Sequence, residues 1–348
     1  IRAHYAKSLV WVFRHRRLTL CMVASCFAIS TYLLLNAGYE LFPRSDVGQM
    51  EIQVRAESGT PLRETERMVA EMESLIRRET GSDLEQIISN IGVFYDLPAV
   101  YTPNSGTQDA FIGIQLKENH HTSSFEYAER LRLLMKREFP GVELSFNTGG
   151  MVTAALNEGK PAPIDVQIVG NDLKILQNIA VRIRDTIASI PATRDVRILQ
   201  RTDQPAKNID IDRMRAASLG VDPVSAIKNL VAALNSTATF DKAFWIDEHN
   251  GNHYYVGVTY PEKEINQYNS LENVAVPSRN RDAAIPFRNF AKIGDGLNPV
   301  EINHQNLMRV FNVYAGVEGD DLGSVSDEAR KRVASMQLPK GYSASFQG

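Results

Sequence analysis

Few side chains in this sequence have the types and spacing that chemical catalysis needs. There is no glycine-rich phosphate loop, no nucleophile elbow and no pair of carboxylates placed for acid–base catalysis. We therefore predict that the chain is not an enzyme, and no residue pattern predicts a cofactor. What remains is binding chemistry, for which methionine, histidine, arginine and aromatic side chains are the candidates.

The methionines would favour metal binding, because thioether sulfur is a suitable ligand for Cu(I). Four methionines are available: Met50, Met68, Met72 and Met151. Met68 and Met72, however, have the spacing of a helix core, and an isolated Met151 after two glycines is a weak indication. Two histidine pairs fall in predicted turns, where we expect them to be solvated: His120 with His121, and His249 with His253. We predict no metal site from these residues.

The composition is that of a folded protein large enough for two or three globular parts. Of the 348 residues 43% are hydrophobic and 23% charged, and the net charge is −3. Such a chain offers no basic field to nucleic acid and lacks the aromatic strand signature of RNA-binding ferredoxin-like domains, so we expect no nucleic-acid partner. Both cysteines, Cys21 and Cys26, lie in one apolar stretch, which leaves no disulfide or thiolate site elsewhere.

The apolar stretch itself is long enough to cross a lipid bilayer, which takes about 20 apolar residues. No charged residue occurs from Leu18 to Tyr39, and the basic residues before it include Arg14, Arg16 and Arg17 without any acid. This bias places the N-terminal side in the cytoplasm. We predict a cytoplasmic interfacial segment over residues 1–17 and a transmembrane helix over residues 18–39. A cleaved signal peptide is the alternative, although its apolar core is usually shorter.

Hydrophobic periodicity after the span predicts an α+β unit. Alternating apolar and polar residues indicate four strands, at residues 50–56, 85–92, 110–116 and 142–146. One helix is expected after Thr60 and Pro61, which offer an N-cap and a first-turn proline, and a second is expected to be capped by Ser124. The resulting order, β-α-β-β-α-β, is the ferredoxin-like arrangement.

The same order then repeats with an insertion. Strands are expected at residues 164–168, 195–199, 309–317 and 342–346, with helices after the first and third of them. Residues 201–295 interrupt this second unit and carry two helices, over 213–219 and 223–234, followed by a hairpin. Asn250-Gly251 predicts a two-residue hairpin turn. A duplicated unit with an inserted module is a specific architecture.

These segments resemble the start of the second half of resistance-nodulation-division (RND) transporters. In that family the seventh transmembrane helix is followed by a turn and an alternating strand, here Phe42, Pro43, Asp46 and Gly48, with Gly59-Thr60 at the end of the strand. Three later segments also match in order: residues 207–230, 285–293 and 338–348. The resemblance covers essentially the whole chain.

The resemblance implies a domain organisation and partners. Residues 46–162 would form one ferredoxin-like porter subdomain, and residues 163–200 with 296–348 the second. Residues 201–295 would form a docking subdomain that interlocks a homotrimer and faces an outer-membrane channel protein. Family members are proton-driven antiporters of the inner membrane that also bind a periplasmic adaptor protein. Most of this chain would then lie in the periplasm.

The resemblance also implies a substrate cleft between the porter subdomains. The residues that match one wall of this cleft are Ile88, Asn90, Val93, Phe94 and Tyr95. Residues 96–108, which include Tyr101, match a flexible loop between two pockets. Arg197 matches an arginine at the cleft entrance that could attract anionic or amphiphilic ligands. Aromatic residues suit amphiphiles because they offer apolar area without demanding fixed hydrogen bonds.

Each of these residues also has a purely structural interpretation. Ile88 could be plain strand core, Phe94 could pack locally, and Arg197 could be a solvated charge at a strand edge. The sequence also departs from the well-studied drug exporters, which carry phenylalanines at the positions of Ile88, Val93 and Gly113. A phenylalanine-rich drug trap is therefore not evident.

The favoured hypothesis is the export of amphiphilic or hydrophobic compounds by an RND efflux pump of which this chain is a part. The main alternative is a single-span, membrane-anchored periplasmic sensor or assembly module, because ferredoxin-like units have many functions. Export of heavy-metal cations is a less favoured alternative.

Overall fold

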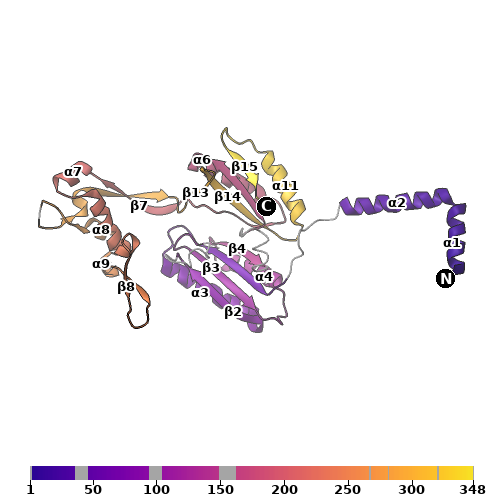
Figure 1. Ribbon diagram of the computed structural model, residues 1–348, viewed down its shortest axis with the longest axis horizontal. Helices are drawn as coiled ribbons and strands as arrows, with labels where there is room; N and C mark the ends of the chain where they lie inside the picture. Colours follow the sequence, from indigo (N-terminus) through magenta and orange to yellow (C-terminus); the bar gives the residue numbers. More distant parts are fainter. Residues whose placement is uncertain are drawn as a thin grey trace. The chain divides into compact units, whose positions relative to one another are not determined.

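Two helices occupy the N-terminus of the computed structural model, which describes residues 2–35, 46–93, 104–148, 162–265, 268–280, 282–319 and 321–347. Helix α1 spans Arg2–Arg14 and helix α2 spans Arg16–Leu35, with His15 between them (Figure 1). Arg16–Leu34 is apolar and long enough to cross a bilayer, and none of it is buried inside the protein. By length and composition α2 is therefore a candidate span. The last residues of the predicted span, 36–39, lie outside the described residues.

The first α+β unit has the predicted element order. Its elements are β1 (Gln49–Arg55), α3 (Leu62–Thr80), β2 (Leu84–Ile91), β3 (Asp109–Leu116), α4 (Ser124–Glu138) and β4 (Glu143–Thr148). The strands form one antiparallel sheet in the order β2-β3-β1-β4. The chain therefore returns twice to the sheet through a helix, and β1 and β3 are its central strands.

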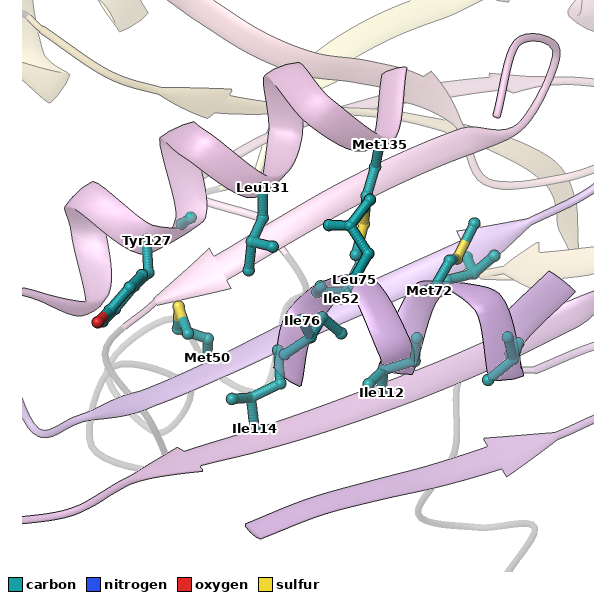
Figure 2. Close-up of a cluster of buried hydrophobic side chains, with 14 of the residues drawn as sticks. Met50, Ile52, Met72, Leu75, Ile76, Ile112, Ile114, Tyr127, Leu131 and Met135 are labelled. Atoms are coloured by element: carbon teal, nitrogen blue, oxygen red, sulfur yellow. The ribbon is translucent and has the colours of Figure 1, made fainter. Parts of the chain in front are cut away.

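The core of this unit lies between the sheet and its two helices. Alternate residues of β1, among them Met50 and Ile52, are buried, and Figure 2 shows them facing Met72 and Ile76 of α3 and Leu131 of α4. Each such side chain stabilises the fold by about 1.5–3 kcal/mol when it is fully buried. Because successive strand residues point to opposite faces, this arrangement directs the polar residues of β1 away from the helices.

The second α+β unit repeats this layout. Its elements are β5 (Ile164–Gly170), α6 (Leu173–Ala188), β6 (Thr193–Ile198), β14 (Met308–Val317), α11 (Leu322–Ala334) and β15 (Ser343–Phe346). The strand order β6-β14-β5-β15 is equivalent to that of the first sheet. A short extra strand, β13 (Asn303–Gln305), pairs with the start of β14 along the edge that β6 occupies further on.

The insertion forms a compact unit of its own, Asp203–Asn298. Strand β7 (Gln204–Ile211) pairs antiparallel with β12 (Ala291–Asn298), so the chain enters and leaves through one two-stranded ribbon. The other elements are α7 (Arg213–Ser218), α8 (Pro223–Asn235), β8 (Ala243–Ile246), β9 (His253–Val256), α9 (Glu262–Ile265), α10 (Tyr268–Glu272), β10 (Ala275–Val276) and β11 (Ile285–Pro286). The described residues also contain short 3-10 turns, η1 (Gly81–Asp83), η3 (Thr237–Thr239) and η4 (Phe287–Asn289). The two predicted helices of the insertion are thus confirmed.

The tip of the β8–β9 hairpin differs from the predicted two-residue turn. The ladder ends at Ile246 and His253, and the backbone amide of Asp247 donates to the carbonyl of Asn252 at 2.9 Å. The Asp247 carboxylate accepts from the amide of His249 at 2.9 Å and from the side chain of Asn250 at 2.7 Å. These bonds close a longer loop in which Asn250 precedes the tip residue Gly251 without forming a tight turn. The prediction was wrong because Asp247 organises the reversal.

Asp46, the first described residue after the candidate span, binds the connection between β3 and α4. Its carboxylate accepts from the Ser124 hydroxyl at 2.7 Å, from the amide of Gly48 at 3.0 Å and from Nε2 of His120 at 3.1 Å. Nδ1 of His120 lies 2.8 Å from the carbonyl of Lys117. Since a carbonyl and a carboxylate both accept, both contacts are hydrogen bonds only when each ring nitrogen carries a proton, as in an imidazolium. The prediction that His120 is solvated was therefore wrong.

Candidate functional site

The first sheet has one face without helices, which we call the open face. It comprises the strand residues that point away from α3 and α4: Gln49, Glu51, Gln53 and Arg55 of β1, Gln86, Ile88 and Asn90 of β2, Phe111, Gly113 and Gln115 of β3, and Glu143, Ser145 and Asn147 of β4. The hydroxyl of Ser89, the residue between Ile88 and Asn90, donates to Glu73 of α3 at 2.7 Å, which fixes the direction of its neighbours. The predicted cleft wall therefore lies on a sheet face rather than in a core.

Strand register arranges the open face in rows across the sheet. One row runs from Ile88 through Gly113 and Glu51 to Asn147. The next row runs from Asn90 through Phe111 and Gln53 to Ser145. Each step is one strand spacing of about 4.8 Å, so Ile88 and Glu51 lie about 10 Å apart.

The predicted wall residues are exposed where the structure describes them. Ile88 has 53% of its surface exposed, so the interpretation as strand core was wrong. Val93 is also exposed, and Asn90 is half-buried. The side chain of Asn104 donates to the carbonyls of Asn90 and Gly92 at 3.1 and 2.9 Å, which closes the base of the intervening loop. The remaining predicted residues lie outside the described residues: Phe94, Tyr95 and Tyr101.

Arg197 reaches the open face from strand β6 of the second unit. Only 8% of it is exposed, so the interpretation as a solvated charge was wrong. Its guanidinium donates to the Ser145 hydroxyl and, at 2.8 Å, to Oε1 of Gln53, and it lies 5.7 Å from the ring centre of Tyr314. Burial, followed by the nearby charge of Arg55, lowers the pKa of Arg197 to about 10. Arg197 thus links the two α+β units.

Other arginines join the two units in the same way. Arg55 of β1 donates to the carbonyls of Ile198 and Leu199 at 3.2 and 2.9 Å. Arg132 of α4 forms an ion pair with Asp195 of β6 at 3.1 Å. The two hydrophobic cores remain separate clusters. The boundary between the units is therefore made of charge-assisted hydrogen bonds, which can be exchanged for water more readily than a shared apolar core.

Arg132 also brings two carboxyl groups together at this boundary. One of its nitrogens contacts both Glu129 and Glu318, the latter at 2.9 Å. Burial and the hydrogen bond with Glu129 raise the pKa of Glu318 to about 7. The same hydrogen bond lowers the pKa of Glu129. The two carboxyls therefore share a proton near neutral pH, and Glu129 keeps the charge.

Glu51 is the residue of the open face that the sequence analysis missed. It is half-buried and accepts from the side-chain amide of Asn147 at 3.3 Å. Burial raises its pKa, and the Asn147 hydrogen bond opposes that rise only in part. The alternation of β1 already directs Glu51 to the face opposite the core, but only the register shows that Gly113 lies beside it.

The described residues thus combine a candidate span with two α+β units of one strand order, the second of which carries an insertion. All of residues 1–348 match the family model described as the AcrB/AcrD/AcrF family. The chain belongs to this family of RND transporters.

Individual relatives support the family and show how much of a transporter this chain represents. Multidrug resistance protein MdtC of Klebsiella pneumoniae (strain 342) is 22% identical over 352 residues, which is 100% of this chain and 32% of the relative. Cobalt-zinc-cadmium resistance protein CzcA of Cupriavidus metallidurans is 24% identical over 336 residues, 94% of this chain and 30% of the relative. The chain thus spans about a third of the length of these relatives.

A solved structure shows the same fold. The crystal structure of a heavy metal efflux pump (crystal form I) superposes with a TM-score of 0.82 over 95% of this chain and 34% of that chain, at 19% identity. At this identity the likeness concerns the fold alone.

Proposed function

We propose that this chain is the periplasmic substrate-binding and docking portion of a proton-driven RND efflux pump of the inner membrane, anchored by α2. Family membership and the candidate span support this proposal. On this view residues 46–162, and residues 163–200 with 296–348, are ferredoxin-like porter subdomains, and residues 201–295 are the docking subdomain. The strand orders of the two sheets and the separate unit Asp203–Asn298 support the division.

The observation that carries the proposal is an open sheet face bordered by a polar boundary. Ile88, Phe111 and Gly113 offer apolar surface, whereas Arg55 and Arg197 close the boundary through hydrogen bonds. Transport requires that a cleft open and close, which rigid units can do by moving about such a boundary. Breaking a few charge-assisted bonds leaves both cores intact, so each unit can move as a body.

We place the substrate on this open face. Its contacts on this proposal are Ile88, Asn90, Val93, Phe94, Tyr95, Tyr101 and Arg197. The exposure of Ile88 and Val93 supports this assignment, as does the position of Arg197 against the same sheet. The substrate class is amphiphilic or hydrophobic, because half-exposed apolar groups alternate here with amides.

The β8–β9 hairpin supports a role in assembly. Phe244 packs on Tyr255 and Trp245 on Tyr254, with ring centres 4.8 and 5.6 Å apart, yet all four side chains are exposed. Exposed aromatic surface of this kind is typical of protein contacts. We propose that it packs in a homotrimer, and that the docking subdomain faces an outer-membrane channel while a periplasmic adaptor binds the assembly.

Export of metal ions is the second candidate function, favoured by the similarity to CzcA. The described residues offer it little support. Met50 and Met72 are buried in the first core, and Met68 packs against it, so their sulfur atoms are not available on the open face. Among the described residues no group of three histidine, cysteine, aspartate or glutamate side chains could hold an ion. Met151 lies outside them.

The proposal is tested by drug accumulation in cells that lack other exporters and express the transporter containing this chain. We expect the transporter to lower the accumulation of a fluorescent amphiphile, and Asn90→Ala with Tyr95→Ala to raise it again. Glu64→Gln on the exposed surface of α3 is the control. Unchanged accumulation together with increased resistance to Zn²⁺ or Co²⁺ would favour metal export instead. A product that stays a single-span monomer without any export would favour the sensor or assembly module.

A further inference from the structure

Glu51 has an unusual position in the middle of the open face. In its row it lies between Gly113 of β3 and Asn147 of β4. Gly113 has no side chain, and a Cβ built there would meet only ordinary contacts, with the carbonyl of Ile88 and the ring of Phe111 both at 3.7 Å. The row therefore has no side chain between Ile88 and Glu51, and we call this position at Gly113 the gap. The carboxylate of Glu51 borders the gap, together with the apolar neighbours Ile88 and Phe111 and the polar Gln115.

The surroundings of Glu51 supply amides but no countercharge. Asn147 donates to Glu51 at 3.3 Å, the one hydrogen bond to this carboxylate from the described residues, and the strand neighbours of Glu51, Gln49 and Gln53, are neutral. In the part of the chain that the structure describes, Glu51 has no ion-pair partner. A half-buried carboxylate without a cation is costly, and a cationic ligand would remove that cost.

The two arginines of the open face are engaged elsewhere. Arg197 belongs to the next row, where Gln53 and Ser145 accept its hydrogen bonds. Arg55 lies two rows from Glu51 and pairs with Asp109 at 3.4 Å. A ligand entering the gap at Gly113 therefore meets the carboxylate of Glu51 before it meets either guanidinium.

The apolar groups around the gap match the other part of an amphiphile. Ile88 lies about 10 Å from Glu51 across the sheet, a distance that an alkyl or aromatic body of moderate size can span. Phe111 lies diagonally next to Glu51, and an aromatic ring attracts a cation through its face. We propose that Glu51 is the residue by which this face selects amphiphiles with a cationic nitrogen head, whose apolar body lies over Gly113 toward Ile88. This inference rests on the proposed export function.

The test uses the transporter that contains this chain, expressed in cells that lack other exporters. Resistance is measured to dodecyltrimethylammonium and to dodecyl sulfate, which share an alkyl chain and differ in the charge of the head. Glu51→Gln keeps the shape and removes the charge. We expect it to reduce resistance to the cation about fivefold and to leave resistance to the anion unchanged or higher. Glu64→Gln, an exposed carboxyl of α3 outside the open face, is the matched control and should change neither.

The outcomes separate the two proposals. If the unsubstituted transporter protects against neither detergent, the export function fails, and Glu51 is not at issue. If it protects and Glu51→Gln lowers both resistances equally at normal protein levels, or lowers neither, the assignment of Glu51 is overturned. Loss of Zn²⁺ resistance alone in Glu51→Gln would also overturn it, in favour of a metal ligand.

Discussion

The two α+β units share a strand order but differ in the face that their helices leave uncovered. In the first unit Ile88 is exposed and Glu51 half-buried, so much of the face is open to a ligand. In the second unit the equivalent face carries Asp165, Gln167 and Asn312, and all three are buried. The same architecture thus presents an accessible surface once and a covered polar surface once.

The covered face is held by a hydrogen-bond network. The side chain of Gln200 donates to Asn312 at 3.1 Å and accepts from its backbone amide at 2.8 Å. Asn312 in turn donates to Asp165 at 2.8 Å. Buried polar groups need such partners, and a connected network fixes one arrangement. The two units thus share one scaffold, whose helix-free face holds a buried polar network in the second unit and stays accessible in the first.

The largest expected effect comes from breaking the link that Arg197 makes between the two α+β units. Arg197→Ala removes a buried guanidinium and leaves Gln53 and Ser145 without their donor. We expect the free energy of unfolding to fall by about 2–4 kcal/mol. Ile88→Ala on the open face should change it by less than about 0.5 kcal/mol. Chemical denaturation of the detergent-solubilised chain measures both, and equal losses in the two variants would contradict the distinction between the faces.

Periodicity explains why the fold was predictable. Strands β1 and β5 both alternate apolar and polar residues, which is typical of a strand with one face in a core, and the stripe on α3 has the period of a helix. Helix starts were less certain. Ser123 rather than Ser124 caps α4, by accepting from the amide of Glu126. The Ser124 hydroxyl binds Asp46 instead, a partner 78 residues away that no local pattern reveals.

The candidate site was predictable only in part. Resemblance pointed to Ile88 and Arg197, but sequence alone could not decide whether either was core, solvent-exposed or in contact with another unit. The register of the strands decides which residues share the open face, because it brings Gly113 beside Glu51 and Gln53 beside Ser145. Burial of Arg197 depends on a contact between elements far apart in the chain. Such long-range contacts leave no periodic signal in the sequence.

A second prediction concerns the Asp46–His120 contact of the first unit. In the second unit Asp321 caps α11 by accepting from the amide of Ser324 at 2.9 Å. Hydrogen bonds to Asp46 and to the Lys117 carbonyl raise the pKa of His120 above 6.5. The resulting stabilisation is complete below the ordinary pKa and is lost as pH rises through the folded-state pKa.

We therefore expect the wild-type chain to lose about 1.5 kcal/mol of stability as pH rises from the ordinary pKa of histidine through the raised pKa of His120, which is the contribution of one charge-assisted hydrogen bond. His120→Gln should remove this part of the pH dependence and leave the part due to Glu318, whereas His304→Gln, at an exposed position of the second unit, should retain both. Thermal unfolding at several pH values measures the effect. A wild-type midpoint that does not fall over this range would refute the imidazolium assignment.

A third prediction tests the boundary between the units through Glu318. Burial and Glu129 raise the pKa of Glu318 from 4.5 to about 7, so the folded state holds a proton that the unfolded state releases. Its contribution to stability is complete below pH 4.5 and is lost as pH rises through 7. Glu318→Gln should therefore be more stable than wild type by about 1 kcal/mol at about pH 8, a difference that solvent screening keeps small. At about pH 5 the two proteins should be equally stable. A variant that is less stable at both pH values would show that the ion pair with Arg132 dominates.

The smallest effect is expected at the β13–β14 hairpin of the second sheet. Asn306 and Leu307 form the two-residue turn between β13 and β14, with φ angles of +48° and +66°. Glycine is strongly preferred at the second position of such a turn, and Leu307 is 97% exposed, so its side chain gains nothing from packing. Leu307→Gly should raise the free energy of unfolding by about 0.5–1 kcal/mol.

Leu307→Ala is the control, because it removes the exposed side chain but keeps the Cβ that strains the backbone. Equal stabilisation by both variants would mean that exposure of the leucine, and not its φ angle, carries the cost. Since β13 pairs only with the second sheet, neither variant should alter the pH dependence due to His120, and a change there would show that the two faces do not act independently.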